Sequence, residues 1–266
     1  MSRPAAKDAD EQFTVTLARG LQILQAFSSA KPVLTNGELV ALTGLEKATV
    51  SRLAFTLIEL GYLRREGLRG GYSLDTGVLM LCYPLLAGMD IRQIARPWMR
   101  DLGERVDGTV SLCVRDRASI IYLDSVRKVD RETPWVDIGS SLPLVESAAG
   151  RAWLCSVPRA QRVAVMNKIR LQMPEVFAAN LKDVEKTQSQ MQRYGFSINR
   201  GAYDVRRVAV AVPMHKPLHG ELIVFSCSLL TDEPLRMAKA REAGYALRAM
   251  VRSVEAAIGM RAIDDA

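Results

Sequence analysis

The stretch from Thr35 to Leu74 constrains the fold of this chain more than any other. It opens with a short apolar pattern suited to a helix, and Gly44 then supplies the backbone freedom for a tight turn. From Glu46 onward, apolar residues recur at helical spacing, namely Val50, Leu53, Ala54, Leu57 and Ile58. Two helices joined by a glycine turn, the second of them amphipathic, are typical of a helix-turn-helix unit.

The second of these helices has small polar and basic side chains on the faces that its apolar stripe leaves free. They are Lys47, Thr49, Ser51 and Arg52. Short donors near the start of a helix can reach base edges and phosphates in a DNA major groove. We therefore predict that these four residues bind DNA.

A basic hairpin follows the two helices. Tyr62-Leu63 and Tyr72 to Leu74 read as strands on either side of a tip rich in glycine and arginine. The arginines that can lie along phosphates are Arg64, Arg65 and Arg69. The pattern predicts a β-hairpin wing that binds DNA. The alternative is a small helical domain with merely solvated polar faces, and the basic hairpin weakens that alternative.

The net charge of +7 suits a polyanionic partner but does not identify one. The local distribution is more informative, because five basic and two acidic side chains lie between Lys47 and Tyr72. This window therefore has a charge of +3, whereas the acidic residues before it bring the first 75 residues close to neutrality. The position of the charge supports DNA binding better than its total.

A chain of 266 residues is long enough for two domains. We expect a disordered lead-in over residues 1–12, a winged helix-turn-helix DNA-binding domain over 13–75, a connector helix over 76–90 and a second domain over 91–262. The connector is apolar enough to pair two subunits, although packing within its own chain is an equal alternative. Pro84 is expected to bend or divide it.

The second domain begins with a helix and then changes to an alternating pattern at Gly108. In the helix, Ile94, Trp98 and Leu102 are expected to face inward, with Arg92, Arg96, Arg100 and Glu104 outward. Strands are expected at 109–114, 119–124, 134–138, 196–199, 207–212 and 221–230, with a loop at 139–143. Further helices are expected at 147–155, 159–170, 181–195 and from 231 to about 260. The fold class is therefore α+β, with an antiparallel sheet in the second domain.

Cysteine usage and the apolar profile indicate the compartment. Cys82, Cys113, Cys155 and Cys227 are far apart and form no CxxC pair, so we expect reduced thiols packed as small apolar groups. The polar N-terminal sequence lacks the apolar run of a signal peptide, and no stretch approaches the length of a membrane span. The sequence predicts a soluble cytoplasmic protein with no membrane partner.

Enzymatic function is the main competing class. The chain has two histidines, His215 and His219, and Pro217 between them favours a hairpin tip over a metal-binding helix face. GxSxG, HExxH and P-loop spacings are absent from the sequence. We therefore predict no catalytic residue, no metal and no cofactor, with a Cys-His nucleophile as a minor alternative.

Four ordered blocks of sequence resemble the IclR family of bacterial transcriptional regulators, over nearly the whole chain from Phe13 to Met260. The blocks are Leu17–Leu24, Thr43–Leu53, Leu142–Ala152 and Val210–Pro213. The chain departs from the family pattern at Ala48, where serine is usual, and at Asp204, where glycine is usual. The resemblance implies that the second domain is a GAF-like effector-binding domain.

The resemblance also implies that this domain binds a small organic acid. The corresponding positions are Ala148, Ala149, Asn199, Ala209, Ser226 and Ser228. The residues themselves make this reasonable, because a helix start with free amides and small side chains favours a carboxylate. The two serines, two apart on a strand, project from one face. Simple packing for the alanines and solvent exposure for the serines are the alternatives.

The predicted function is therefore a DNA-binding transcriptional regulator whose operator binding or activation is controlled by a small organic acid. The stretch from Asn199 to Pro213 looks most like the family branch that controls breakdown of aromatic acids. The predicted partners are double-stranded operator DNA, the organic acid and further copies in a homodimer or homotetramer, with RNA polymerase as an additional candidate. The alternative is a small-molecule-binding scaffold or enzyme with a basic docking hairpin.

Overall fold

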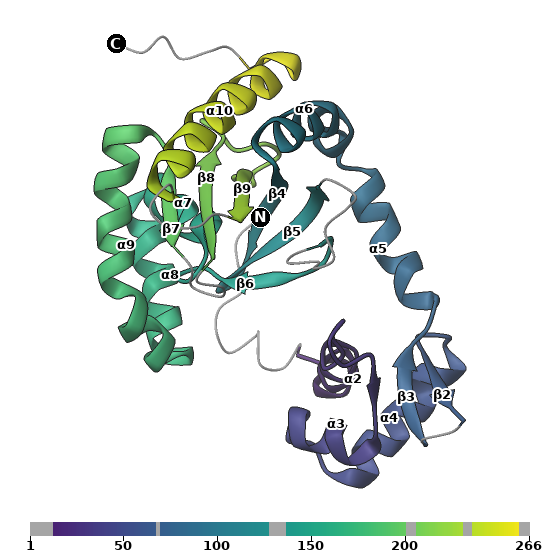
Figure 1. Ribbon diagram of the computed structural model, residues 1–266. Coiled ribbons are helices and arrows are strands. Elements are labelled where there is room, and N and C mark those ends of the chain that lie inside the picture. Colours follow the sequence, from purple (N-terminus) through teal and green to yellow (C-terminus); the bar gives the residue numbers. More distant parts are fainter. Residues whose placement is uncertain (1–12, 68–69, 128–136, 201–205, 231–235, 261–266) are drawn as a thin grey trace. The chain divides into compact units, whose positions relative to one another are not determined.

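The computed structural model describes residues 13–67, 70–127, 137–200, 206–230 and 236–260 (Figure 1). The chain forms two compact units, Met1–Gly88 and Met89–Ala266. The predicted lead-in over residues 1–12 lies outside the described residues, as do Arg69 and Asp204. Among the described residues no single helix is long and apolar enough to cross a membrane, and α5 (Gly77–Ala87) and α6 (Asp90–Val106) reach that length and composition only as a bent pair.

The first unit is a winged helix-turn-helix. It contains α2 (Val15–Gln25), β1 (Val33–Leu34), α3 (Asn36–Thr43), α4 (Lys47–Glu59), β2 (Leu63–Glu66), β3 (Gly71–Leu74) and α5. The strands form an antiparallel sheet in the order β1-β3-β2. One apolar core joins the helices to the sheet, and its buried residues are Ile23, Leu34, Leu39, Val50, Ala54, Leu57, Leu63 and Tyr72. The predicted helix pair and wing are thereby confirmed.

The helix α3 is closed at both ends by local signals in the sequence. Thr35 and Glu38 form a capping box, in which the Thr35 amide donates to Glu38 Oε2 at 2.7 Å and the Thr35 hydroxyl accepts from the Glu38 amide. At the other end, Gly44 adopts a left-handed φ of 68°. Lys31 also contacts Glu38, with Nζ 2.9 Å from Oε1. These bonds lower the pKa of Glu38 from 4.5 to about 2, and the bond from Lys31 makes the largest contribution.

Because the pKa of Glu38 is lower in the folded chain, we expect its contribution to stability to be complete above about pH 4.5 and to disappear as the pH falls towards 2. The difference in melting temperature between the wild type and Glu38→Gln, measured calorimetrically, should shrink over this range. Glu59→Gln, at an exposed position of α4, is the matched control. A difference that is constant from pH 7 to pH 2.5 would contradict the proposed role of the carboxylate.

The helix α5 continues through Pro84 and ends at Ala87, so this proline does not divide the helix, and the alternative of a bend at Pro84 stays a prediction. Its apolar side chains are mostly exposed, with Leu79, Met80 and Tyr83 between 68% and 77% accessible. Cys82 is exposed on the same helix, contrary to the expectation that every cysteine is packed as an apolar group. Cys113 and Cys227 are buried as expected, and burial raises the pKa of both thiols to about 12.

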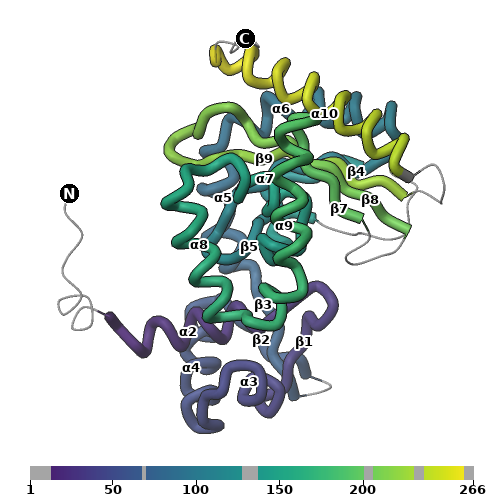
Figure 2. The backbone as a smooth tube through the Cα atoms, turned by 90° about the vertical axis from the view of Figure 1, so that its left-hand side faces the viewer, coloured from purple at the N-terminus to yellow at the C-terminus, as the bar shows by residue number. Residues whose placement is uncertain are grey.

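The second unit is built on a six-stranded antiparallel sheet in the order β6-β5-β4-β9-β8-β7. The strands are β4 (Gly108–Asp116), β5 (Ser119–Val126), β6 (Ser141–Pro143), β7 (Ser197–Arg200), β8 (Arg207–Pro213) and β9 (Val224–Leu230). The helices α6 and α10 (Arg236–Ala257) pack together on one face. On the other face lies α7 (Ala148–Ser156), with α8 (Arg159–Gln172) and α9 (Pro174–Tyr194) side by side outside it (Figure 2).

Several boundaries of the second unit differ from the prediction. The expected loop at 139–143 contains strand β6, which pairs with β5. A strand was expected at 134–138, but residues 137–138 form none, and 134–136 lie outside the described part. The expected helix start at 231–234 also lies outside it. The helix α9 starts seven residues before the predicted position, because Pro174 and Glu175 form a helix start. The strand β9 starts at Val224 rather than at residue 221.

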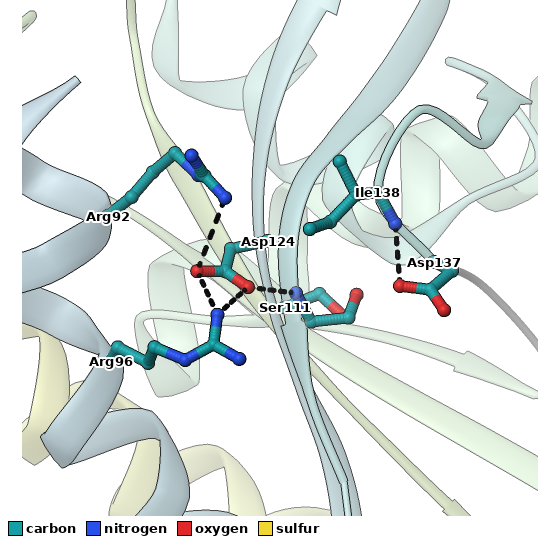
Figure 3. Close-up of polar contacts among 7 residues, drawn as sticks. Arg92, Arg96, Ser111, Asp124, Asp137 and Ile138 are labelled. Carbon is teal, nitrogen blue, oxygen red and sulfur yellow. Dashed lines mark hydrogen bonds and ion pairs between the residues drawn. The ribbon is translucent and has the colours of Figure 1, made fainter. Parts of the chain in front are cut away.

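The inward face of α6 was predicted correctly only in part, since Leu102 is buried and Ile94 half-buried as expected. Ile91, Ala95, Met99 and Leu102 are buried, whereas Trp98 is 43% exposed. Arg92 and Arg96 do not simply face solvent, since both point at Asp124 of β5 (Figure 3). Arg96 Nη1 lies 2.8 and 2.9 Å from the two carboxylate oxygens of Asp124, and Arg92 Nη2 lies 3.9 Å from one of them. The buried carboxylate thus determines which side of α6 faces the sheet.

Candidate functional site

The first candidate site is the exposed side of α4. Lys47, Ser51 and Arg52 are exposed and Thr49 is half-buried, while Val50, Ala54 and Leu57 form the buried side. The four residues predicted to bind DNA therefore lie in the first two turns of a helix anchored by its apolar stripe. Ser51 has a further contact, because its hydroxyl accepts a hydrogen bond from Asn36 Nδ2 of α3 at 2.9 Å. This bond connects the two helices of the motif.

The two described arginines of the wing have different environments. They are neighbours on β2, so their side chains project from opposite faces. Arg64 Nε donates to Ser73 Oγ at 3.0 Å and to Glu66 Oε1 at 3.2 Å. Hydrogen bonds from Ser73 and Arg64 lower the pKa of Glu66, and the bond from Ser73 has the larger effect. The Arg65 guanidinium lies 5.9 Å from the centre of the Tyr72 ring. Arg65 therefore keeps a charge that no neighbouring carboxylate balances among the described residues.

The second candidate site is on the face of the sheet that α7 covers. Asn199, Ala209 and Ser228 are direct partners across β7, β8 and β9, so they share one face. Ser226 projects from that same face, two residues before Ser228. Two hydrogen bonds connect the start of α7 to this face of the sheet. The Ser197 hydroxyl donates to the Ala148 carbonyl at 2.7 Å, and Asn199 Nδ2 donates to the Glu146 carbonyl.

The start of α7 has free hydrogen-bond donors. Ser147 caps the helix by accepting from the Gly150 amide at 2.9 Å. The amides of Ala148 and Ala149 have no acceptor among the residues that the structure describes. Both side chains are buried, at 3% and 1% exposure. Two free amides at the positive end of a helix dipole form an environment that favours an anion.

Sequence reasoning missed other hydroxyl and thiol groups on this face. Ser111 Oγ of β4 is 2.8 Å from Ser125 Oγ, and Cys113 Sγ is 3.8 Å from Ser226 Oγ. Ser111 and Ser197 are almost completely buried. The signal was the alternation Thr109, Ser111, Cys113 on β4, which repeats the spacing of the two serines on β9. Only the register of β4 against β9 reveals that the two sets lie together.

Comparisons with known proteins identify both units. Residues 16–67 match the family model of the IclR helix-turn-helix domain, and residues 84–259 match that of the bacterial transcriptional regulator IclR C-terminal domain. The HTH-type transcriptional regulator TsaQ1/TsaQ2 of Comamonas testosteroni is 33% identical over 246 residues, which are 91% of this chain and 87% of that protein. KipR of Bacillus subtilis is 30% identical over 202 residues, 75% of this chain and 79% of KipR.

Solved structures show the same fold over the same length. An IclR family transcriptional regulator from Brucella abortus is 36% identical, with a TM-score of 0.82 and 96% of each chain covered. An IclR homolog from Microbacterium hydrocarbonoxydans, solved with 4-hydroxybenzoate, is 20% identical to this chain. Its TM-score is 0.64, with 90% of this chain and 99% of that one covered, and at this identity the similarity shows the fold alone. By its fold and by both of its domains, this chain belongs to the IclR family of bacterial transcriptional regulators.

Proposed function

We propose that this regulator reads its operator with the exposed side of α4 and that a small organic acid, bound at the start of α7, controls that binding. The observation that carries the DNA-binding part is the exposure of Lys47, Ser51 and Arg52 on a helix whose other side is anchored in the core. Arg52 is assigned to a base edge, because guanidinium groups pair with guanine through two hydrogen bonds. Lys47 and Thr49 are assigned to phosphates.

Within the wing, we assign the principal phosphate contact to Arg65. Arg64 is already bonded to Glu66 and Ser73, so part of its charge is balanced within the protein. Arg69 at the tip is included as a third candidate on the sequence alone. A contact with phosphate contributes affinity for any sequence and makes binding sensitive to salt.

Arg52→Ala should weaken binding to the operator by about 2 kcal/mol, roughly thirtyfold, and leave binding to random DNA nearly unchanged. Arg65→Ala should weaken both by similar factors and reduce the dependence of binding on salt concentration by about one unit of slope. Fluorescence anisotropy with the upstream region of its own gene and a scrambled duplex measures both. If Arg52→Ala loses equal affinity for the two duplexes, Arg52 contacts phosphate rather than a base edge. If the wild type shows no sequence-specific binding, the scaffold or enzyme alternative is favoured.

The effector part of the proposal is supported by the free amides of Ala148 and Ala149 opposite the row Asn199, Ala209 and Ser228. The amides would bind the carboxylate, and the hydroxyls would bind its second oxygen or a substituent. An aromatic acid is the narrower proposal, in line with the 4-hydroxybenzoate bound by the Microbacterium homolog.

Ser228→Ala should weaken binding of the effector acid by about 1 kcal/mol, roughly fivefold, because one hydrogen bond is lost. Differential scanning fluorimetry with 4-hydroxybenzoate, benzoate and acetate first identifies an acid that raises the melting temperature. Ser189→Ala, at an exposed position of α9, is the matched control and should bind as the wild type does. If none of the acids raises the melting temperature of the wild type, the assignment to these acids is wrong.

We also propose that two copies pair through the first unit. The exposed apolar side chains of α5 are Leu79, Met80, Leu81, Tyr83 and Leu85, and a second copy of the helix is the partner that would bury them. A dimer also presents two α4 helices to successive major grooves, as in other helix-turn-helix regulators. An acid that favours one arrangement of the dimer over another would change the spacing of these helices and so control DNA binding. Pairing of the effector-binding domains in addition would give a homotetramer.

A further inference from the structure

A pocket of about 420 Å³ lies beside the C-terminal half of α7, away from the helix start where the effector is proposed to bind. Residues from four parts of the second unit line it: the end of β4, the end of α7, the start of α8 and the segment from the end of β8 to β9. Its volume is within the range of small-molecule sites. None of the six positions assigned to the effector lines this pocket.

Three side-chain nitrogens around this pocket lack a hydrogen-bond partner. They are Arg115 Nε, Trp153 Nε1 and His215 Nε2, and each is enclosed by protein. Trp153 is the most buried, with 2% of its surface exposed, and its indole N–H can only donate. Arg115 Nε and Trp153 Nε1 can only donate, and buried donors in native proteins nearly always have an acceptor, so two unpaired donors at one pocket indicate a ligand.

Charged groups around the pocket restrict the ligand. The Arg115 guanidinium lies 4.7 Å from the centre of the Trp153 ring, and Arg115 makes no ion pair among the described residues. His215 Nδ1 is 2.8 Å from Glu255 Oε1, so a carboxylate already faces that side of the ring. Glu221, which is exposed, also lines the pocket. With one cation and two carboxylates around it, the pocket can accommodate at most a single negative charge, placed beside Arg115.

The walls determine the rest of the ligand. Val157, Pro213 and Leu222 provide apolar surface beside the three nitrogens. Arg115 and Trp153 are donors, so the ligand must offer acceptor oxygens, and a carboxylate offers two. We propose that this pocket is a second ligand site, which binds a small monocarboxylic acid with an apolar body. It is separate from the effector site, and the inference does not depend on that proposal.

Binding requires a local movement of one side chain. Arg115 is half-buried, and its Nη1 donates to the Arg117 carbonyl at 2.9 Å in the turn between β4 and β5. A rotation of Arg115 away from the Trp153 ring exposes the indole N–H to the pocket and turns Nε–H towards the same acceptor. The acid then replaces a cation–π contact by two hydrogen bonds to its carboxylate.

The indole resonances of the full-length, ¹⁵N-labelled protein provide a direct test. Trp153→Phe assigns the Trp153 peak, and Trp98, which is 43% exposed and on the opposite side of the sheet, is the internal control. Benzoate should move the Trp153 peak to saturation, whereas the Trp98 peak should stay in place. Arg115→Gln should weaken this binding at least about tenfold, because a charged hydrogen bond is lost. Arg117→Gln, two residues along the same turn, should have no effect.

Three outcomes would overturn the proposal. The first is a Trp153 peak that neither benzoate nor acetate moves, and the second is equal affinity in Arg115→Gln and the wild type. The third is tighter binding of inorganic phosphate than of either acid. Ser156→Phe, which fills the exposed rim of the pocket, is the second variant if Arg115→Gln does not fold, and it should abolish the shift. Ser228→Ala should leave the affinity obtained from the Trp153 shift unchanged, since a weakening of about fivefold would assign the shift to the effector site.

Discussion

Replacing Gly150 by alanine is expected to lower the free energy of unfolding of the second unit by about 3 kcal/mol. A Cβ atom at Gly150 would lie 2.2 Å from the carbonyl oxygen of Leu144 and 2.5 Å from its Cα. Both are backbone atoms, so no side-chain rotation can relieve the overlap. The start of α7 would have to move away from the segment before it. Because Ala148 and Ala149 lie on that first turn, the same substitution should weaken binding of the effector acid.

Urea unfolding followed by circular dichroism measures the loss. Gly37→Ala in α3 is the matched control, since a Cβ there has nothing within 4 Å and the φ angle is ordinary. That variant should be unchanged or slightly more stable, because alanine is the better helix former. A Gly150→Ala variant as stable as the wild type would mean that α7 does not rest on the Leu144 backbone as described.

The second large effect is expected at the buried carboxylate of β5. Arg96→Gln should destabilise the second unit by about 3 kcal/mol, the lower end of the range for breaking a buried ion pair. Asp124 is 2% exposed at its side chain and, among the described residues, would keep as partners only Arg92, at 3.9 Å, and the amide of Ser125, at 2.9 Å. Since Arg96 itself is 47% exposed, the loss arises from the carboxylate that remains buried, not from the arginine.

Arg100→Gln tests whether the effect is specific to the ion pair. Arg100 lies one turn further along α6 and is exposed, so its replacement should change the free energy of unfolding by less than about 0.5 kcal/mol. Urea unfolding of the two variants side by side separates a buried ion pair from a general effect of charge on α6. Equal stability of Arg96→Gln and Arg100→Gln would show that Asp124 does not depend on Arg96.

The parts of this protein that could be predicted have their signals close together in the sequence. The helix pair follows from apolar spacing and Gly44, and the wing follows from alternation around a glycine-rich tip. The start of α7 was visible because Ser147 is a capping residue followed by small side chains. In the helices the deciding contacts join residues within about four positions, and in the wing they join two strands separated by a short tip, so a periodic pattern records them directly.

The errors arose where a distant residue decides the local structure. Trp98 was expected inside, but Asp124, 26 positions later, draws Arg92 and Arg96 to the sheet and turns the helix. The strand β6 was read as a loop, because its three residues become a strand only through pairing with β5. Ser111 and Ser125 were missed, since their neighbours on the face of the sheet that α7 covers belong to other strands.

The sequence by itself determined the two kinds of domain, the helix-turn-helix with its basic wing, and the residue types suited to an anion. Those features depend on local periodicity, capping and charge. Only the tertiary structure decided that Asn199, Ala209, Ser226 and Ser228 from three strands share one face. It also decided that the charge of Arg64 is balanced by Glu66 while that of Arg65 is not, and that Arg115, Trp153 and His215 surround one pocket. Strand register and helix packing bring these residues together, and neither is encoded at any one position.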